Sequence, residues 1–229
     1  MPEPSTEGIA VGLSETDLGP ARLQLFGADP HLLVFGDSET GKTNTLRVIT
    51  AQLIRVREPE DLGIVVIDYR RTLLGAVPDE YQMAYCSTRT ATETMSTELA
   101  RLITDRLPPS NLTAEQLRGR SWWQGPEMVV VVDDYDMVAT SAGNPLLSLV
   151  ELLPYGRDVG LHLILARRAG GASRALFDPL LQRLGDLATA GLLHSGSRGE
   201  GPLACGVPAT RLPAGRAIWA RHTARSGPF

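Results

Sequence analysis

The sequence predicts an α/β protein, built on a mostly parallel sheet with helices on both faces. Short, continuous apolar runs, such as HLLVF at 31–35 and VVVV at 129–132, are typical of parallel strands that are buried on both sides. Amphipathic stretches, such as residues 42–57 and 91–107, alternate with these runs along the chain. Apolar strands separated by amphipathic helices favour right-handed crossovers within one parallel sheet.

The first half of the chain predicts strands and helices in turn. Residues 21–26 alternate apolar and polar side chains, which indicates a short strand before the buried run at 31–35. A single apolar stripe on the helix predicted at 42–57 consists of Leu46, Ile49, Leu53 and Val56. The elements expected next are a strand at 62–69, another at 81–86, and a helix at 91–107 that Pro108 and Pro109 end.

The second half continues the alternation. Residues 110–127 are expected to form a loop or a short helix, before a strand over MVVVVDDYD at 128–136. Asn144 as N-cap and Pro145 at the first helical position predict a helix within 144–160. The remaining expected elements are a strand at 161–166, helical turns in 173–188 interrupted by Pro179, a loop at 195–201 and a final strand at 216–221.

Composition limits the class of protein. The 229 residues are 43% hydrophobic and 21% charged, which is ordinary for a soluble globular domain. The net charge of −4 provides no overall basic field for nucleic acid. Cys86 and Cys205 have neither metal-site nor redox spacing, which favours a reducing compartment. No apolar run reaches the roughly 20 residues that a membrane-spanning helix needs.

The expected domain organisation is simple. Residues 1–20 are rich in Pro, Gly, Ser and acids, and are interpreted as an N-terminal arm or an interdomain linker. Residues 21–229 are expected to form one domain, which could be a soluble piece of a larger, membrane-anchored protein.

The segment between the strand at 31–35 and the following helix has the pattern of a phosphate-binding loop. Its fixed positions are Gly36, Gly41, Lys42 and Thr43, in the spacing G-x-x-x-x-G-K-[ST]. The glycines let successive backbone N–H groups turn inward towards phosphate, and the start of the helix adds a positive dipole end. Lys42 is expected to reach the β and γ phosphates, and the Thr43 hydroxyl to ligate Mg²⁺. The expected ATP-binding residues are Gly36, Asp37, Ser38, Glu39, Thr40, Gly41, Lys42, Thr43 and Asn44.

Two carboxylates within this loop need an explanation, because the loop should attract anions. Backbone N–H groups hold the phosphates in such loops, so the side chains of Asp37 and Glu39 are expected to point outward into solvent. Two alternatives stay open: these acids contact a neighbouring subunit, or they are ordinary solvated loop residues.

A second motif follows the valine run. Asp133 at the strand end is expected to hold the Mg²⁺ shell, through water or through Thr43. Asp134 stands where many such ATPases place a glutamate that polarises the attacking water, and it is predicted to be catalytic together with Lys42. Aspartate is one methylene shorter, and a misplacement of about 1 Å can cost about 100-fold in rate. The sequence therefore predicts nucleotide binding more firmly than fast hydrolysis.

Other residues leave alternatives open. Arg167 follows the strand at 161–166, where it could contact phosphate, form a salt bridge with Asp133, Asp134 or Asp136, or end the strand in solvent. Trp122 and Trp123 fit either a loop anchor or a protein-binding patch. The spacing of the four histidines does not favour a metal site; they are His31, His162, His194 and His222.

Taken in order, five segments resemble one family. HLLVFGDSETGKTNTLR, LGIVVIDYRR, MVVVVDDYDMV, GRDVGLHLILARR and LPAGRA are similar to the EccC-type, FtsK/SpoIIIE-like ATPases of type VII (ESX) secretion, above all to their C-terminal ATPase domain. The resemblance implies a RecA-like P-loop NTPase fold, ATP and Mg²⁺ as ligands, and hexameric assembly with other ATPase domains of the same motor. The matching positions are Gly36, Gly41, Lys42 and Thr43 for the phosphate loop, Asp133 for the magnesium-coordinating acid and Asp134 for the second acid.

The resemblance also implies partners and a location. Small helical WxG-type secreted proteins would be recognised through a C-terminal signal in an apolar pocket. The domain would lie in the cytoplasm at the inner face of the cell membrane, and only the rest of the full-length protein would contact the membrane. The alternatives are a nucleotide-stabilised substrate-binding module without significant ATPase activity and, disfavoured by the net charge, a DNA translocase.

Overall fold

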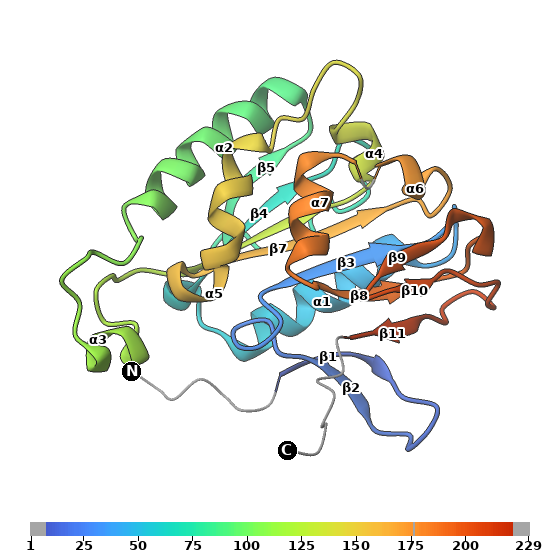
Figure 1. The fold of residues 1–229 in the computed structure, drawn as a ribbon, viewed down its shortest axis with the longest axis horizontal. Helices are drawn as coiled ribbons and strands as arrows, with labels where there is room; N and C mark the ends of the chain where they lie inside the picture. The colour runs from blue at the N-terminus through green and yellow to red at the C-terminus, as the bar shows by residue number, and fades with distance from the viewer. Residues whose placement is uncertain (1–7, 176, 222–229) are drawn as a thin grey trace.

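The computed structural model, which describes residues 8–175 and 177–221, has one large sheet (Figure 1). Its seven strands lie in the order β11-β8-β3-β7-β6-β4-β5, and every neighbouring pair is parallel except β11 with β8. The strand bounds are β3 His31–Phe35, β4 Leu62–Ile67, β5 Gln82–Cys86, β6 Glu127–Val132, β7 Leu161–Arg167, β8 Ala190–Leu193 and β11 Ile218–Ala220. The predicted α/β fold with a mostly parallel sheet is therefore confirmed.

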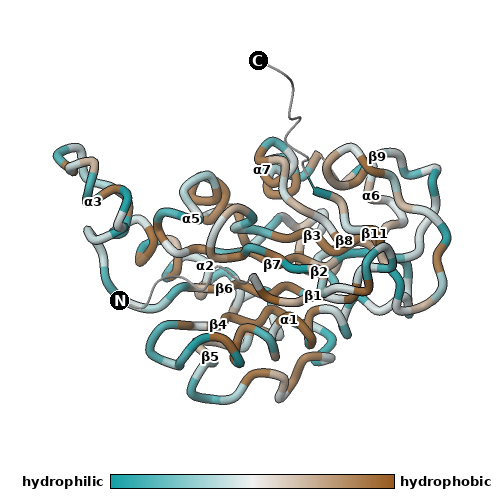
Figure 2. Tube along the Cα trace, turned by 90° about the horizontal axis from the view of Figure 1, so that it is seen from below, coloured by the Kyte–Doolittle hydropathy of each residue, from teal (hydrophilic) through white to brown (hydrophobic). Residues whose placement is uncertain are grey.

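Helices cover both faces of this sheet. Helix α1 (Lys42–Val56) packs on one face, whereas α2 (Arg89–Thr104), α5 (Gly156–Val159), α7 (Pro179–Asp186) and the 3₁₀ helix η2 (Leu147–Tyr155) cover the other. Figure 2 shows the sheet nearly edge-on, with α1 on one side and α5 and α7 on the other. Short helices complete the chain: η1 Pro59–Asp61, α3 Ala114–Gly119, α4 Tyr135–Val138, α6 Ala172–Ala175 and η3 Arg198–Glu200.

The alternation of side chains along each strand divides the core in two. Leu32 and Val34 of β3 belong to the cluster under α1, while Leu33 and Phe35 belong to the cluster under α2, η2 and α7. The central strands β3, β4 and β7 are buried along their whole length, which explains their continuous apolar sequences. Burial on both faces fixes the register and hence the position of the strand ends.

Part of the expected N-terminal arm is packed on the domain. β1 (Ile9–Leu13) pairs antiparallel with β2 (Pro20–Leu23), and Ile9 is buried in the cluster under α1. The arm therefore does not extend to residue 20 as a free segment, because strand pairing and one buried isoleucine hold residues 9–13 in place. Residues 1–7 of the predicted arm lie outside the described residues.

Several elements of the structure differ from the prediction or were not predicted. The helix expected after Asn144 is 3₁₀ over Leu147–Tyr155, with Pro154 inside it. Pro179 begins α7 instead of interrupting it, because Asp178 caps the helix by accepting bonds from the N–H groups of Leu180 and Leu181. β8 was not predicted, since four residues are too few for a periodic pattern. A small antiparallel pair, β9 (Pro202–Ala204) with β10 (Val207–Pro208), follows the loop that was expected at 195–201.

Within the described ranges, none of the helices has both the length and the apolar character needed to cross a lipid bilayer.

Candidate nucleotide site

The phosphate loop and the strand-tip acids meet at one edge of the sheet. Residues 36–41 connect the end of β3 with the start of α1, and Asp133 and Asp134 follow β6. β7 lies between β3 and β6 in the sheet, so the carboxyl ends of these parallel strands lie side by side (Figure 1). Ligands of such sheets bind beyond these strand ends.

The loop is shaped as the motif requires. Glu39 (φ 61°) and Gly41 (φ 113°) both have left-handed backbone conformations. Gly36 is closely packed, and a Cβ there would lie 2.6 Å from the Cβ of His194. A side chain at position 36 would push the loop away from His194, the residue that follows β8.

Backbone donors of the loop remain available. Asp37 N–H donates to the carbonyl of Ser195 (2.8 Å), and Gly36 N–H donates to the carbonyl of Arg167 (3.3 Å). From residue 38 to residue 44, no backbone N–H donates to any acceptor among the described residues. Because unpaired N–H groups normally find partners, this curved row of donors is suited to an anion.

Lys42 lies inside the loop. Its Nζ donates to the carbonyl of Asp37 (2.9 Å), and the residue is only 6% exposed. It is the one lysine among the 22 lysines and arginines of the chain. The side chains of Asp37 and Glu39 belong to exposed residues, as expected, and no ion pair of either is found within the described part of the chain. Ser38 and Asn44 are exposed too, and Thr40 is half-buried.

Asp133 is almost fully buried and is held by hydroxyl groups. Thr43 Oγ1 donates to its Oδ2 (2.7 Å), and Thr72 Oγ1 donates to the same oxygen (2.9 Å). Burial raises the pKa of Asp133; the bonds from Thr43 and Thr72 oppose this rise, and the neighbouring charge of Asp134 adds to it. A buried carboxylate beside a hydroxyl is an oxygen donor set that suits a hard cation such as Mg²⁺.

Asp134 lies beside it in a strained conformation. Its φ is 46°, its N–H donates to Asp133 Oδ1 (3.0 Å), and its own carboxylate pairs with Arg70 (3.2 Å). Sequence reasoning missed both Arg70 and Thr72. Each lies in the loop after β4, which carries no motif of its own, and only the IDYRR resemblance touched this loop.

Arg167 fits neither of the two protein-only alternatives. It is 4% exposed, its Nε donates to the carbonyl of Arg168 (3.0 Å), and burial lowers the pKa of its guanidinium. The salt bridge with Asp136 is made by Arg168 (2.9 Å), whereas Arg167 forms none among the described residues. Strand burial holds the side chain out of solvent, so only the phosphate contact stays a prediction.

His194 is a third residue that the sequence did not single out for this site. Its Nε2 lies 3.0 Å from Thr45 Oγ1 in the first turn of α1, and Gly215 N–H, nearby, donates to the carbonyl of Thr40 (3.3 Å). Burial lowers the pKa of His194, and the charge of Lys42 lowers it further. The loop is thus supported from behind by the segments after β8 and before β11.

Two other histidines, His31 and His162, lie away from this edge. His162 bridges Glu127 and the carbonyl of Pro30, and His31 bonds to backbone groups of Leu153 and Leu163. His222 lies outside the described residues. In the part of the chain that the structure describes, no three His, Cys, Asp or Glu side chains converge as metal ligands.

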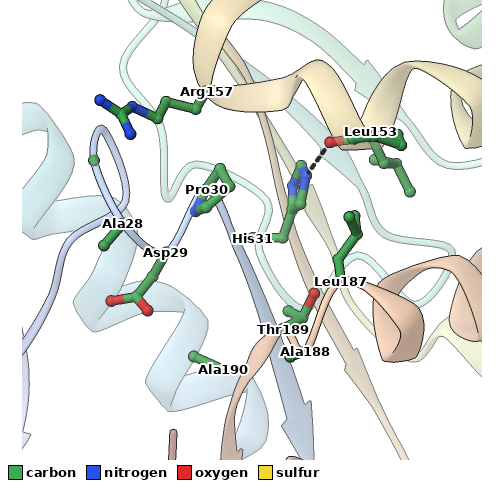
Figure 3. Close-up of a pocket in the computed structure, with 12 residues that line it drawn as sticks. Ala28, Asp29, Pro30, His31, Leu153, Arg157, Leu187, Ala188, Thr189 and Ala190 are labelled. Atoms are coloured by element: carbon green, nitrogen blue, oxygen red, sulfur yellow. Dashed lines mark hydrogen bonds between the residues drawn. The ribbon is translucent and has the colours of Figure 1, made fainter. Parts of the chain in front are cut away.

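Two further features lie at the opposite edge of the sheet. Trp122 and Trp123 donate their indole N–H groups to the carbonyls of Arg106 (2.7 Å) and Asp158 (2.8 Å), as a loop anchor would. A cavity of about 240 Å³ lies where β3 and β8 begin, beside Asp29, His31 and Arg157 (Figure 3). It lies at the other ends of these strands from the phosphate loop, and so forms no part of the nucleotide site.

Comparisons with known proteins agree with this geometry. Residues 14–107 match the FtsK/SpoIIIE family. The ESX secretion system protein EccC of Thermomonospora curvata is 48% identical over 219 residues, which cover 96% of this chain and 16% of that protein. The chain therefore spans about one-sixth of the length of this curated relative.

Two solved structures from the same organism are also similar. The cytoplasmic domain of the type VII secretion ATPase EccC is 47% identical with a TM-score of 0.91, over 97% of this chain and 26% of that one. EccC ATPases 2 and 3 in complex with a signal sequence peptide are 47% identical with a TM-score of 0.89, over 93% of this chain and 39% of that one. The chain thus belongs to the FtsK/SpoIIIE family, as an ATPase domain of the EccC type.

Proposed function

We propose that this domain binds ATP with Mg²⁺ and works as a weakly or conditionally hydrolysing unit of a type VII secretion motor. The N–H groups of residues 38–44 and the Lys42 ammonium would hold the phosphates. Thr43 and Asp133 would hold the metal ion, which would neutralise charge on the phosphate oxygens when bound. Asp134 would orient the attacking water.

One observation carries this proposal. The unpaired N–H groups of the loop, the 2.7 Å bond between Thr43 and Asp133, and Lys42 all lie at the same strand edge. Among the described residues, the ammonium of Lys42 bonds only to a carbonyl of its own loop, so it can exchange this neutral acceptor for charged phosphate at little cost. An ordinary turn before a helix would not need a buried carboxylate such as Asp133 opposite Thr43, the second residue of the helix.

Slow turnover follows from the second acid. Asp134 is shorter than glutamate and is engaged by Arg70, so its carboxylate is poorly placed to polarise water. An arginine from a neighbouring domain would complete the site, an effect that reaches about 10³–10⁵ in rate in other nucleotide hydrolases. Hydrolysis would then depend on assembly, for which a hexamer with the other ATPase domains of the motor is the expected form.

Partners and location are proposed on the same basis. The similar structure of EccC ATPases 2 and 3 holds a signal sequence peptide, which supports recruitment of small helical WxG-type substrates through a C-terminal signal. The net charge of −4 disfavours nucleic acid as a partner. The domain would lie in the cytoplasm, at the inner face of the membrane, and would reach the bilayer only through the rest of the full-length protein.

Calorimetry and phosphate release on one set of variants test this function. ATP·Mg²⁺ should bind the wild-type domain, and Lys42→Ala should abolish detectable binding because the ammonium contacts the terminal phosphates. Phosphate release should be slow, fall with Asp134→Asn and rise with Asp134→Glu, measured with the assembled protein. Equal ATP affinity of the wild type and Lys42→Ala would rule out the site.

The same experiment separates the second candidate function. A nucleotide-stabilised recruitment module is favoured by the short, arginine-paired acid at position 134. It predicts ATP binding that needs Lys42, together with phosphate release that stays at background in both Asp134 variants. The DNA-translocase hypothesis would gain support only if the protein shifted duplex DNA in a gel at low salt.

A further inference from the structure

The loop after β4 is organised around one buried carboxylate. Asp68, which is 1% exposed, accepts a hydrogen bond from Leu73 N–H (2.6 Å) and another from the Tyr85 hydroxyl (2.8 Å) on its Oδ2. Its Oδ1 accepts from Arg70 N–H (3.1 Å). Bonds to both sides of the turn hold residues 68–73 in a single conformation.

This loop presents two side chains to the two acids after β6. Thr72 donates to Asp133 and Arg70 pairs with Asp134, so each strand-tip acid has one partner in the loop. The carbonyl of Thr72 also accepts a bond from Arg47 Nη2 of α1. Thr72 is therefore fixed by its backbone and its side chain, between the helix of the phosphate loop and the strand that carries Asp133.

Both oxygens of Asp133 are engaged. Oδ1 accepts the N–H of Asp134, and Oδ2 accepts the hydroxyls of Thr43 and Thr72. Thr43 has a second task in the proposed function, because its oxygen would ligate the metal ion. Thr72 has no such task. Its hydroxyl lies 2.9 Å from Asp133 Oδ2 and 3.3 Å from Asp68 Oδ1, so Asp133 is the nearer of its two acceptors.

We propose that Thr72 is a positioning residue for the metal side of the nucleotide site, acting through Asp133. This inference rests on the proposed function and identifies a third segment, the loop after β4, as part of the site. Removing the Thr72 hydroxyl leaves a buried carboxylate with one donor fewer, so Asp133 turns more freely and holds a cation less well. Nucleotide held without metal does not need this contact.

Fluorescent ATP-analogue binding, with Mg²⁺ and with a chelator, tests the inference on the whole chain. Thr72→Val keeps the shape of the side chain and removes the hydroxyl, while Thr72→Ser restores it. Thr72→Val should weaken binding about tenfold in Mg²⁺ and leave binding in chelator unchanged, and Thr72→Ser should stay within about twofold of the wild type. Thr104→Val is a matched control, because within the described part of the chain that hydroxyl bonds only to Ala100 of its own helix.

Each other outcome has one meaning. Thr72→Val within twofold of the wild type in Mg²⁺ would overturn the inference, as would an equal loss with and without metal, which indicates a merely structural role. Failure of Thr72→Ser to restore binding would overturn it too. If the wild type itself binds no nucleotide, the proposed function fails first and this inference fails with it.

Discussion

His31 shows at the residue scale how burial decides a protonation state. Its Nδ1 accepts the N–H of Leu163 (3.1 Å), so its Nε2 must carry the proton that it donates to the carbonyl of Leu153 (2.9 Å) (Figure 3). Burial lowers the pKa of His31 to about 4, and the bond to Leu153 only partly opposes this. A second proton would have to bind Nδ1, which already accepts the N–H of Leu163, and it would place a positive charge in the core.

This residue predicts an acid-dependent loss of stability. The unfolded chain binds the proton near pH 6.5 and the folded chain only near pH 4, so stability is fully present above pH 6.5 and falls as the pH approaches 4. The loss should reach about 3 kcal/mol. Urea unfolding of the wild type and His31→Gln between pH 7.5 and 4 should give a flatter curve for the variant.

Glu127 sets the lower limit of the pH range in which the effect of His31 on stability can be measured by itself. Burial would raise its pKa, but bonds and charges from His162 and Arg120 outweigh burial and lower the pKa to about 2. Its stabilising effect is therefore lost only below about pH 4.5. Parallel stability curves for the wild type and His31→Gln between pH 6.5 and 4.5 would refute the assignment of the neutral histidine.

Residues of the candidate site were predictable where a motif fixes their spacing. The sequence identified the phosphate loop, and it paired Thr43 with Asp133 across 90 positions because both follow buried parallel strands. Thr72, Arg70 and His194 were not found. A threonine, an arginine or a histidine in a loop has no periodic signal, and these three acquire their positions only through tertiary contacts.

At the scale of elements, the β1–β2 hairpin carries a direct test of where the domain begins. Ile9 is 3% exposed and packs in the cluster under α1, whereas Leu13 of the same strand is 77% exposed. Ile9→Ala should lower the free energy of unfolding by about 2 kcal/mol, and Leu13→Ala should change it by less than about 0.5 kcal/mol.

Chemical denaturation of the two variants decides between two descriptions of residues 9–13. A difference of the expected size means that this strand is part of the folded unit. Equal stabilities would restore the free arm or linker that the composition of residues 1–20 suggested.

Long, periodic elements were predicted almost to the residue, and short or irregular ones were not. α1 and β3 match their predicted bounds because burial, glycine and helix periodicity agree there. The helix after Asn144 failed as an α-helix: the amide of Asn144 donates to Tyr135 and Asp178 while its oxygen accepts from Leu146. Tyr135 and Asp178 lie 9 and 34 positions from Asn144, so no local pattern could reveal these two bonds.

At the scale of the whole molecule, the sheet brings three separate segments to one edge. The loop after β3, the loop after β4 and the acids after β6 meet at this edge. They do so because β3, β7, β6 and β4 are neighbours in the sheet and run parallel, so their carboxyl ends lie together. The central claim is that this edge binds the phosphates of ATP, with Lys42 against them. The domain is about one-sixth of the length of its EccC relative, and the part in a larger motor that we propose for it depends on this claim.

Because Lys42 is the one lysine in the sequence, an ATP whose terminal phosphate carries an acyl group tests the claim most directly. The Lys42 amine would attack the acyl carbonyl, form an amide and release ATP. We predict that mass spectrometry of peptides will find the acyl group on Lys42, and that excess ATP·Mg²⁺ will suppress it. No acylation of Lys42, or acylation that excess ATP·Mg²⁺ leaves unchanged, would contradict nucleotide binding at this loop.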